Sequence, residues 1–233
     1  MNYTIVFLVE GKTEAEFVKS LPAAGFRLAR KAHLRPIPLT TSSGKKGTFK
    51  GGAVNFKRVE KQLRELFSTH RGESFRFTTM FDFGDLKENQ GFPGFHTKPS
   101  NDPYKQVEHL ETSLLQELED WRFIPYFQLY EFESLLFTDL DCLKILFGER
   151  APFADRKFKQ LAALKNDFKG NPEIINSNNS PSKRITAWWG GFKRQKVTVG
   201  GQLAMVIGEE TLRGQCQHFD DWLTRLEQSV SPA

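Results

Sequence analysis

Cysteine is scarce in this sequence. Only two cysteines, Cys142 and Cys216, occur among the 233 residues, and they lie far apart in the chain. Their number and spacing fit neither a disulfide framework nor a cysteine-based zinc site. The sequence also has no cluster of His and Cys residues that would indicate a softer metal. We therefore expect a reduced, cytoplasmic protein.

Long apolar runs are missing as well. No stretch reaches the roughly 18 apolar residues that a membrane span requires, and no signal peptide is apparent. The P-loop order G-x-x-x-x-G-K-[ST] is also absent, although residues 42–52 are rich in glycine and lysine. We therefore expect a soluble protein without a membrane partner and without this type of nucleotide site.

The charge of the chain is only mildly unbalanced. The sequence contains 33 Lys and Arg against 28 Asp and Glu, which gives a net charge of +5 and a pI near 9.1. Such a balance is compatible with a polyanionic partner, although many other proteins share it. Hydrophobic residues make up 39% of the chain, enough to form a sizeable core.

The order of predicted elements indicates an α/β fold. Short apolar runs rich in β-branched and aromatic residues predict strands at residues 3–9, 34–39, 75–81 and 123–129. Amphipathic segments predict helices from residue 13, over 54–67 and over 103–119. This alternation predicts a mainly parallel sheet flanked by helices in residues 1–138. Residues 139–233 contain short helical patterns broken at Gly200-Gly201 and elsewhere, and we expect a helical extension packed on the first domain.

Three of the predicted strands end in acidic residues. Glu10 follows the first, Asp82 and Asp85 follow the third, and Glu131 and Glu133 follow the fourth. Parallel neighbouring strands would bring these carboxylates to one edge of the sheet, where open α/β folds place their sites. Carboxylates with water and substrate phosphate are the ligands that Mg²⁺ prefers, and Mn²⁺ takes similar ones.

Each acid also has a structural interpretation. Thr13-Glu14-Ala15-Glu16 fits a capping box, which favours a capping role for Glu16 and leaves Glu14 open between a role in the first helical turn and a role as a metal ligand. Asp85 fits a turn equally well. For Glu10 and Asp82 we favour function over a structural ion pair, because burying charge at the end of a strand is costly. Of Glu131 and Glu133, we expect one to be functional.

Several segments resemble a known family. Val9-Glu10-Gly11-Lys12-Thr13-Glu14 resembles the opening motif of Toprim domains, the catalytic fold of primases, type II topoisomerases and the OLD-type nucleases. With residues 77–83, 91–94, 128–137, 181–185 and 207–223, the chain is identified as a member of the domain-of-unknown-function 4276 family. That group is Toprim-like and often encoded beside an ATPase of the AAA or ABC-like class.

The resemblance implies which residues form the site. Its first-strand glutamate would be Glu10, with later acids binding Mg²⁺. Toprim enzymes usually carry D-x-D after a later strand, but here Asp82 is followed at that spacing by Gly84. The second ligand would then come from Asp85, Glu131 or Glu133, or be absent. Because the OLD-type nucleases use a lysine at the metal site, the resemblance suggests Lys183.

Basic residues suggest contacts to nucleic acid. Lys45, Lys46 and Lys50 lie in a glycine-rich segment that could close over phosphates, and a solvated loop is an equal alternative. Ser180-Pro181-Ser182 predicts a helix start beside Lys183 and Arg184, where an anion could bind. The aromatic residues among the cations at 188–196 could stack on bases, but we favour a core role for them.

Together these observations predict a Toprim-like nuclease that uses Mg²⁺ or Mn²⁺ to cleave DNA or RNA. Glu10, Asp82 and one of Glu131 or Glu133 would hold the metal, and Lys183 would stabilise the transition-state charge. The resemblance implies that an ATPase partner and a role in anti-phage defence accompany this activity. The alternative is a binding or sensor module that docks on the ATPase without turnover, which Gly84 favours. A primase-like nucleotidyl transferase is a weaker third interpretation.

Overall fold

The computed structural model describes residues 3–40, 54–153, 156–175 and 180–230. The predicted phosphate contacts of Lys45, Lys46 and Lys50 lie outside these described residues. Among the described helices, none is long and apolar enough to cross a membrane.

The sheet has five strands, and every pairing in it is parallel. The order is β2-β1-β3-β4, and β5 pairs with β3 beyond β4. The strands are β1 (Tyr3–Val9), β2 (Ala32–Pro38), β3 (Phe75–Asp82), β4 (Phe123–Ile124) and β5 (Phe127–Gln128). The predicted α/β class with a mainly parallel sheet is therefore confirmed.

The fourth predicted strand is interrupted between β4 and β5. Pro125 has no N–H to give to the ladder. The Thr79 side chain of β3 fills the gap: its Oγ1 donates to the Tyr126 carbonyl oxygen at 2.9 Å and accepts from the Tyr126 N–H at 3.0 Å. The strand therefore continues towards the carboxyl end of β3 after the break.

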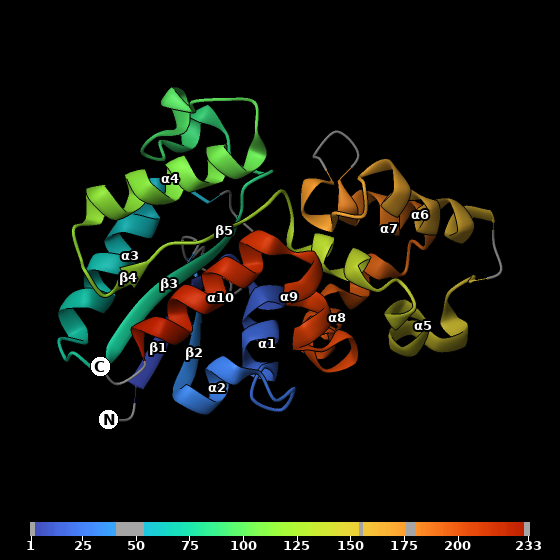
Figure 1. The fold of residues 1–233 in the computed structure, drawn as a ribbon, viewed down its shortest axis with the longest axis horizontal. Helices are drawn as coiled ribbons and strands as arrows, with labels where there is room; N and C mark the ends of the chain where they lie inside the picture. Colours follow the sequence, from blue (N-terminus) through green and yellow to red (C-terminus); the bar gives the residue numbers. More distant parts are fainter. Residues whose placement is uncertain (1–2, 41–53, 154–155, 176–179, 231–233) are drawn as a thin grey trace, which may run out of the picture.

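Helices cover both faces of the sheet (Figure 1). Val6 and Leu8 of β1 lie in a core with α3 (Phe56–Thr69) and α4 (Pro103–Leu118). Ile5, Phe7 and Val9 face the opposite core, shared with α1 (Lys12–Ser20), α8 (Phe192–Ile207) and α10 (Gln217–Ser229). Alternate residues of a strand point to opposite faces, so a strand buried on both sides is apolar throughout.

The chain after residue 139 returns to the sheet. Trp222 of α10 is fully buried, stacks on Tyr126 with ring centroids 4.0 Å apart, and donates from Nε1 to Thr78 Oγ1 at 2.8 Å. The domain boundary at residue 139 stays a prediction. The remaining helices are α2 (Arg27–Lys31), α5 (Cys142–Phe147), α6 (Arg156–Asp167), α7 (Pro181–Trp188) and α9 (Glu209–Gln215), with 3₁₀ turns η1 (Glu88–Gln90), η2 (Phe95–Thr97), η3 (Phe132–Thr138), η4 (Gly148–Arg150) and η5 (Pro172–Ile174).

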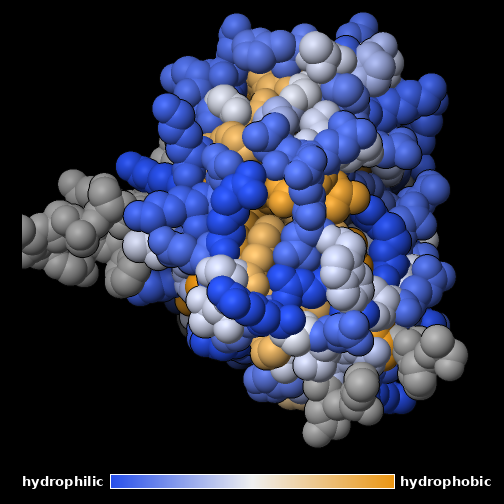
Figure 2. All heavy atoms as spheres, turned by 90° about the vertical axis from the view of Figure 1, so that its left-hand side faces the viewer, coloured by the Kyte–Doolittle hydropathy of each residue, from blue (hydrophilic) through white to orange (hydrophobic). Residues whose placement is uncertain are grey.

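The outer surface is mostly polar on the side where α3 ends and β3 begins. Figure 2 shows hydrophilic residues over most of that side, with hydrophobic residues visible in a central strip. The acids predicted to form the site lie away from this side, at the carboxyl ends of the strands.

The predicted break at Gly200-Gly201 is wrong, because α8 continues through both glycines. The two helices α1 and α8 cross closely at this point. A Cβ atom added to Gly200 would overlap the Thr13 carbonyl oxygen of α1. Glycine is needed there for the close approach of the helices, and its low helix propensity does not end α8.

We predict opposite effects for alanine at these adjacent glycines. Gly200→Ala will lower the free energy of unfolding by roughly 1–3 kcal/mol, since the new methyl group meets rigid backbone. Gly201→Ala is the matched control: its Cβ would lie 3.5 Å from Glu16 Cβ, and better helix propensity should add about 0.5–1 kcal/mol. Urea denaturation measures both, and equal effects would contradict this packing.

Candidate metal and nucleic-acid site

Glu10 and Asp82 meet at the carboxyl edge of the sheet. Glu10 follows β1 directly and Asp82 ends β3. Glu10 Oε2 accepts from the Asp82 N–H at 3.3 Å, and Asp82 Oδ1 accepts from the Phe132 N–H at 2.9 Å. These bonds connect the ends of β1 and β3 with the segment that follows β5. Three pieces of chain far apart in the sequence therefore share one edge.

Glu14 is the capping residue of α1. The helix begins at Lys12, so its N-cap is Gly11 and its third residue is Glu14. Glu14 Oε2 accepts from the Gly11 N–H at 2.9 Å. The capping role predicted for Glu16 is wrong, because the helix begins two residues earlier than that motif requires. Glu16 instead pairs with Lys19 at 2.7 Å on the surface.

Glu131 accepts a hydrogen bond from the start of a helix. Its Oε2 lies 2.9 Å from the Ser182 N–H in the first turn of α7, and its side chain is buried. The sequence predicts that an anion could bind at this helix start, and here a carboxylate of the protein occupies that position. Unsatisfied N–H groups and the helix dipole both favour negative charge there.

Glu133 pairs with Lys196, which the sequence analysis placed among aromatic residues and cations and did not assign to the metal site. Lys196 Nζ of α8 lies 2.6 Å from Glu133 Oε1, and the glutamate side chain is only 7% exposed. Burial lowers the pKa of Lys196, but Glu133 and the neighbouring acids outweigh this and raise the pKa overall. Lys196 follows the buried Phe192 by four residues, so helical spacing places it beside the core, a weak signal in the sequence.

The two basic residues predicted on α7 have different surroundings. Lys183 is exposed, and its suggested role stays a prediction. The Arg184 guanidinium lies over the Phe168 ring, 5.4 Å from its centroid, and lines a cavity of about 350 Å³ between α6 and α7. Trp188 and Phe192 are buried, in keeping with the core role favoured for these aromatic residues.

The carboxylates at this edge disfavour one another's charge. Burial first and then the nearby charge of Glu14 raise the pKa of Glu10 to about 7. Burial, followed by the charges of Glu10 and Glu14, raises the pKa of Asp82 well above its usual value. The pKa values of Glu14 and Glu133 are raised too, in both cases chiefly by burial. Crowded acids of this kind are a common feature of functional sites.

The donor set suits a hard divalent cation, which prefers carboxylate oxygens. Within the described residues, however, no three Asp, Glu, His or Cys side chains are already arranged to hold a metal ion. Glu10, Asp82 and Glu131 each have an oxygen engaged with a backbone N–H. The residues therefore fit such a cation in their chemistry, and side-chain adjustment would be needed to bind one.

Comparison with known proteins identifies the family. The model of the family described as "Domain of unknown function (DUF4276)" matches residues 9–227. The chain belongs to this family. None of the curated proteins compared with it matches. Among solved structures, it is similar to the C-terminal region of the Burkholderia pseudomallei OLD protein, with a TM-score of 0.47 and 13% identity over 99% of this chain and 100% of that one.

In this member of the DUF4276 family, Gly84 is fixed by a close backbone contact. The Gly84 N–H donates to the Tyr130 carbonyl oxygen at 2.8 Å. A Cβ atom at residue 84 would lie 2.7 Å from that oxygen, closer than real side chains come. The second acid of the Toprim pattern is thus disfavoured at this position by the chain after β5. Asp85 is exposed, although its charge contributes to the raised pKa of Glu10.

We predict that the Glu133–Lys196 pair matters for stability. Lys196→Met should lower the free energy of unfolding by about 1–2 kcal/mol, because it leaves a buried carboxylate without its partner. The expected loss of stability is smaller than for a fully buried ion pair, since the Lys196 side chain is 37% exposed and partly screened by water. The double variant Lys196→Met/Glu133→Gln should recover most of the loss.

The matched control is Lys193→Met, which removes an exposed lysine from the same helix. Thermal denaturation of wild type, Lys196→Met, Glu133→Gln and the double variant forms a double-mutant cycle, and Lys193→Met is its control. If the double variant loses as much stability as Lys196→Met, the ion pair with Glu133 is not the source of the loss.

Proposed function

We propose that this protein is a Toprim-like nuclease that cleaves DNA or RNA phosphodiesters with Mg²⁺ or Mn²⁺. The observation that carries the proposal is the group of carboxylates at the carboxyl edge of the sheet. Burial and the charge of Glu14 raise the pKa of Glu10 there, and burial and the charges of Glu10 and Glu14 raise the pKa of Asp82. A divalent cation would relieve this repulsion, which explains why acids that destabilise one another are found together.

Each residue has a defined task in this proposal. Glu10, Asp82 and one of Glu131 or Glu133 would hold the cation, which when bound would neutralise phosphate charge and activate water. The Phe132 N–H orients Asp82, and the Ser182 N–H orients Glu131. Lys196 neutralises Glu133 in the absence of metal and is placed to support negative charge beside it. It is therefore a stronger candidate than the exposed Lys183.

A direct cleavage assay tests the activity. Supercoiled plasmid, single-stranded DNA and RNA are incubated with the protein in Mg²⁺, in Mn²⁺ and in EDTA. We expect cleavage of at least one substrate that depends on metal and is lost in Asp82→Asn. Cleavage that persists in EDTA or in Asp82→Asn would contradict the proposed site.

A second candidate function is a binding or sensor module that docks on a partner ATPase. The specific observation favouring it is Gly84, which leaves the site one acid short of the Toprim pattern. Isothermal titration calorimetry separates the two proposals. Tight binding of the partner ATPase without any Mn²⁺ binding would favour the module, whereas Mn²⁺ binding lost in Asp82→Asn would favour the nuclease. A role in anti-phage defence is compatible with either.

A further inference from the structure

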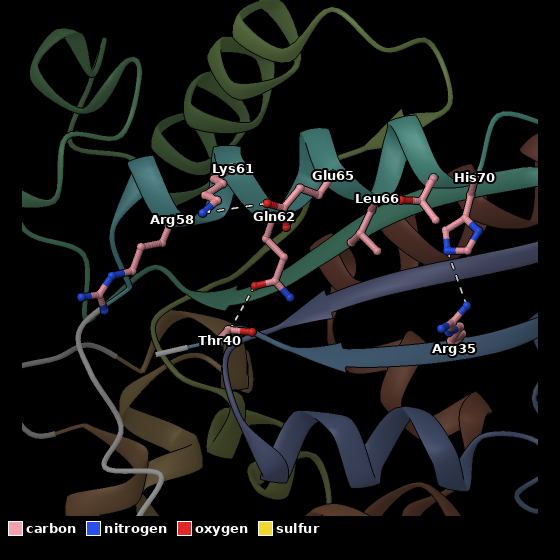
Figure 3. Close-up of a pocket in the computed structure, with 9 residues that line it drawn as sticks. Arg35, Thr40, Arg58, Lys61, Gln62, Glu65, Leu66 and His70 are labelled. Carbon is pink, nitrogen blue, oxygen red and sulfur yellow. Dashed lines mark hydrogen bonds and ion pairs between the residues drawn. The ribbon is translucent and has the colours of Figure 1, made fainter. Parts of the chain in front are cut away.

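A groove lies between helix α3 and the open edge of strand β2. Its volume is about 570 Å³, and it is lined by Arg35 and Thr40 of the β2 side and by Arg58, Lys61 and Gln62 of α3. Thr40 lies opposite Gln62, and Arg35 lies opposite His70 towards the other end (Figure 3). None of the acids at the carboxyl edge of the sheet lines it. The groove is therefore a separate feature from the carboxylate site.

The lining of the groove is predominantly basic. Arg35, Arg58 and Lys61 are exposed, and Glu65 is the acid that faces them. Lys61 Nζ lies 3.9 Å from Glu65 Oε1, with both side chains well exposed to water. Surface pairs of this kind contribute little energy, so Lys61 remains available to another anion. His70, whose Nε2 lies 3.5 Å from Arg35 Nη1, extends the polar lining.

The start of α3 adds to this positive potential. Asn55 caps the helix by accepting from the Lys57 N–H at 3.1 Å, and no acid lies in the first turn. Lys57 and Arg58 occupy that turn instead, where the helix dipole disfavours cations. Basic residues at the positive end of a helix are unfavourable for folding, but they create a strong attraction for an anion.

The edge of β2 is unsuited to receiving another strand. The Leu39 N–H donates to the Val9 carbonyl oxygen at 2.8 Å. The backbone N–H and C=O groups of alternate residues 35, 37 and 39 therefore point towards β1. The backbone of Pro36 and Pro38 then points towards the open edge, where proline has no N–H to donate to a further strand. A ligand in this groove must be recognised through side chains, which argues against an added peptide strand.

One end of the groove lies close to the carboxylate site. Thr40 follows β2, and its N–H donates to Gln62 Oε1 at 3.0 Å, which ties this end of β2 to α3. Val9 pairs with Pro38 in the sheet and is followed directly by Glu10. A chain lying in the groove could thus extend past Thr40 towards the carboxyl edge of the sheet.

We propose that this groove binds the phosphate backbone of a nucleic-acid strand and leads it to the carboxylate site. The choice of ligand rests on the proposed nuclease function, but binding can be measured without metal or cleavage. Three exposed cations on the two walls of one groove favour a polyanion over a single small anion, and the contacts would not depend on base sequence.

Binding of a fluorescein-labelled single strand of about 20 nucleotides in EDTA, followed by anisotropy, tests the proposal. Arg35→Glu/Arg58→Glu should weaken binding by at least about tenfold and flatten the plot of log K against log salt by roughly 0.7 for each phosphate that is no longer bound. The control, Arg30→Glu/Lys144→Glu, changes the net charge equally at exposed residues of α2 and α5. Melting temperatures verify that both variants are folded.

Equal weakening in both double variants, or wild-type binding in the groove variant, would overturn the proposal. Asp82→Asn separates it from the nuclease function, because this variant should keep its affinity for the strand and lose only cleavage. If the protein binds the strand through the groove but never cleaves it, the proposed nuclease function is overturned and the proposed groove stands. If the protein cleaves and the groove variant binds the strand as wild type does, the proposed groove is overturned and the nuclease function stands.

Discussion

Glu10→Gln will reduce metal-dependent cleavage by at least about 100-fold, the scale of loss when one preorganised charge-stabilising group is removed from an active site. Glutamine keeps the shape of the side chain, and its Oε1 can still accept from the Asp82 N–H as Glu10 Oε2 does. The substitution removes a negative charge and a hard anionic ligand. Single-turnover rates on the substrate that the wild-type protein cleaves measure the effect.

Glu16→Gln is the matched control for Glu10→Gln, because it makes the same chemical change on the adjacent helix. Glu16 pairs with Lys19 at the surface and contacts none of the other acids through a described bond. Its cleavage rate should stay within about twofold of wild type, since surface substitutions away from special features have small effects. Comparable losses in both variants would contradict the assignment of Glu10.

The same reasoning predicts that stability and activity will respond in opposite directions. The raised pKa of Glu10 shows that its ionised form is disfavoured in the folded protein at neutral pH. Neutral glutamine removes that penalty, so Glu10→Gln should melt at a higher temperature than wild type in EDTA. Unchanged or lower stability with loss of activity would indicate damage to the fold, and would not support loss of a metal ligand.

Gly84→Asp will destabilise the protein, although it restores the D-x-D spacing of Toprim enzymes. Its Cβ would lie 2.7 Å from the Tyr130 carbonyl oxygen and 3.0 Å from Tyr130 Cα, both backbone atoms that cannot move without disturbing β3 and the chain after β5. Overpacking of this kind typically costs about 1–3 kcal/mol, and burying a further carboxylate adds to the loss. Urea denaturation measures the change.

Gly190→Asp is the control for Gly84→Asp, because a Cβ atom at residue 190 meets nothing within 4 Å. We expect its stability to be within about 0.5 kcal/mol of wild type. If Gly84→Asp were as stable as Gly190→Asp and bound Mn²⁺ more tightly than wild type, the contact with Tyr130 would not be the reason for the glycine.

The general fold could be predicted from sequence, because strands buried on both faces are apolar throughout. Residues 3–9 form a nearly unbroken run of this kind, residues 75–81 form a weaker one that includes Arg76 and two threonines, and each leads to an acid. The meeting of Glu10 and Asp82 at one edge followed from parallel pairing alone, since Glu10 comes directly after β1 and Asp82 is the last residue of the neighbouring β3. Local pattern and tertiary structure agree wherever burial determines both.

Features that depend on contacts between distant segments could not be predicted. Lys196 reaches Glu133 from a helix that begins more than 50 residues later, and periodicity says nothing about that meeting. Gly200 looks like a helix break locally, yet its close contact with Thr13 makes it part of a long helix. Gly84 is likewise explained by the Tyr130 backbone, which no local pattern reveals.

The central claim is that the carboxylates of Glu10 and Asp82, with one of Glu131 or Glu133, bind a divalent cation. The most direct measurement is anomalous diffraction from crystals of the protein soaked with Mn²⁺. The account predicts an anomalous peak between Glu10 and Asp82, with a carboxylate oxygen of each as a ligand at about 2.0–2.3 Å. A peak that contacts neither residue, or no peak at Mn²⁺ concentrations that support cleavage, would contradict it.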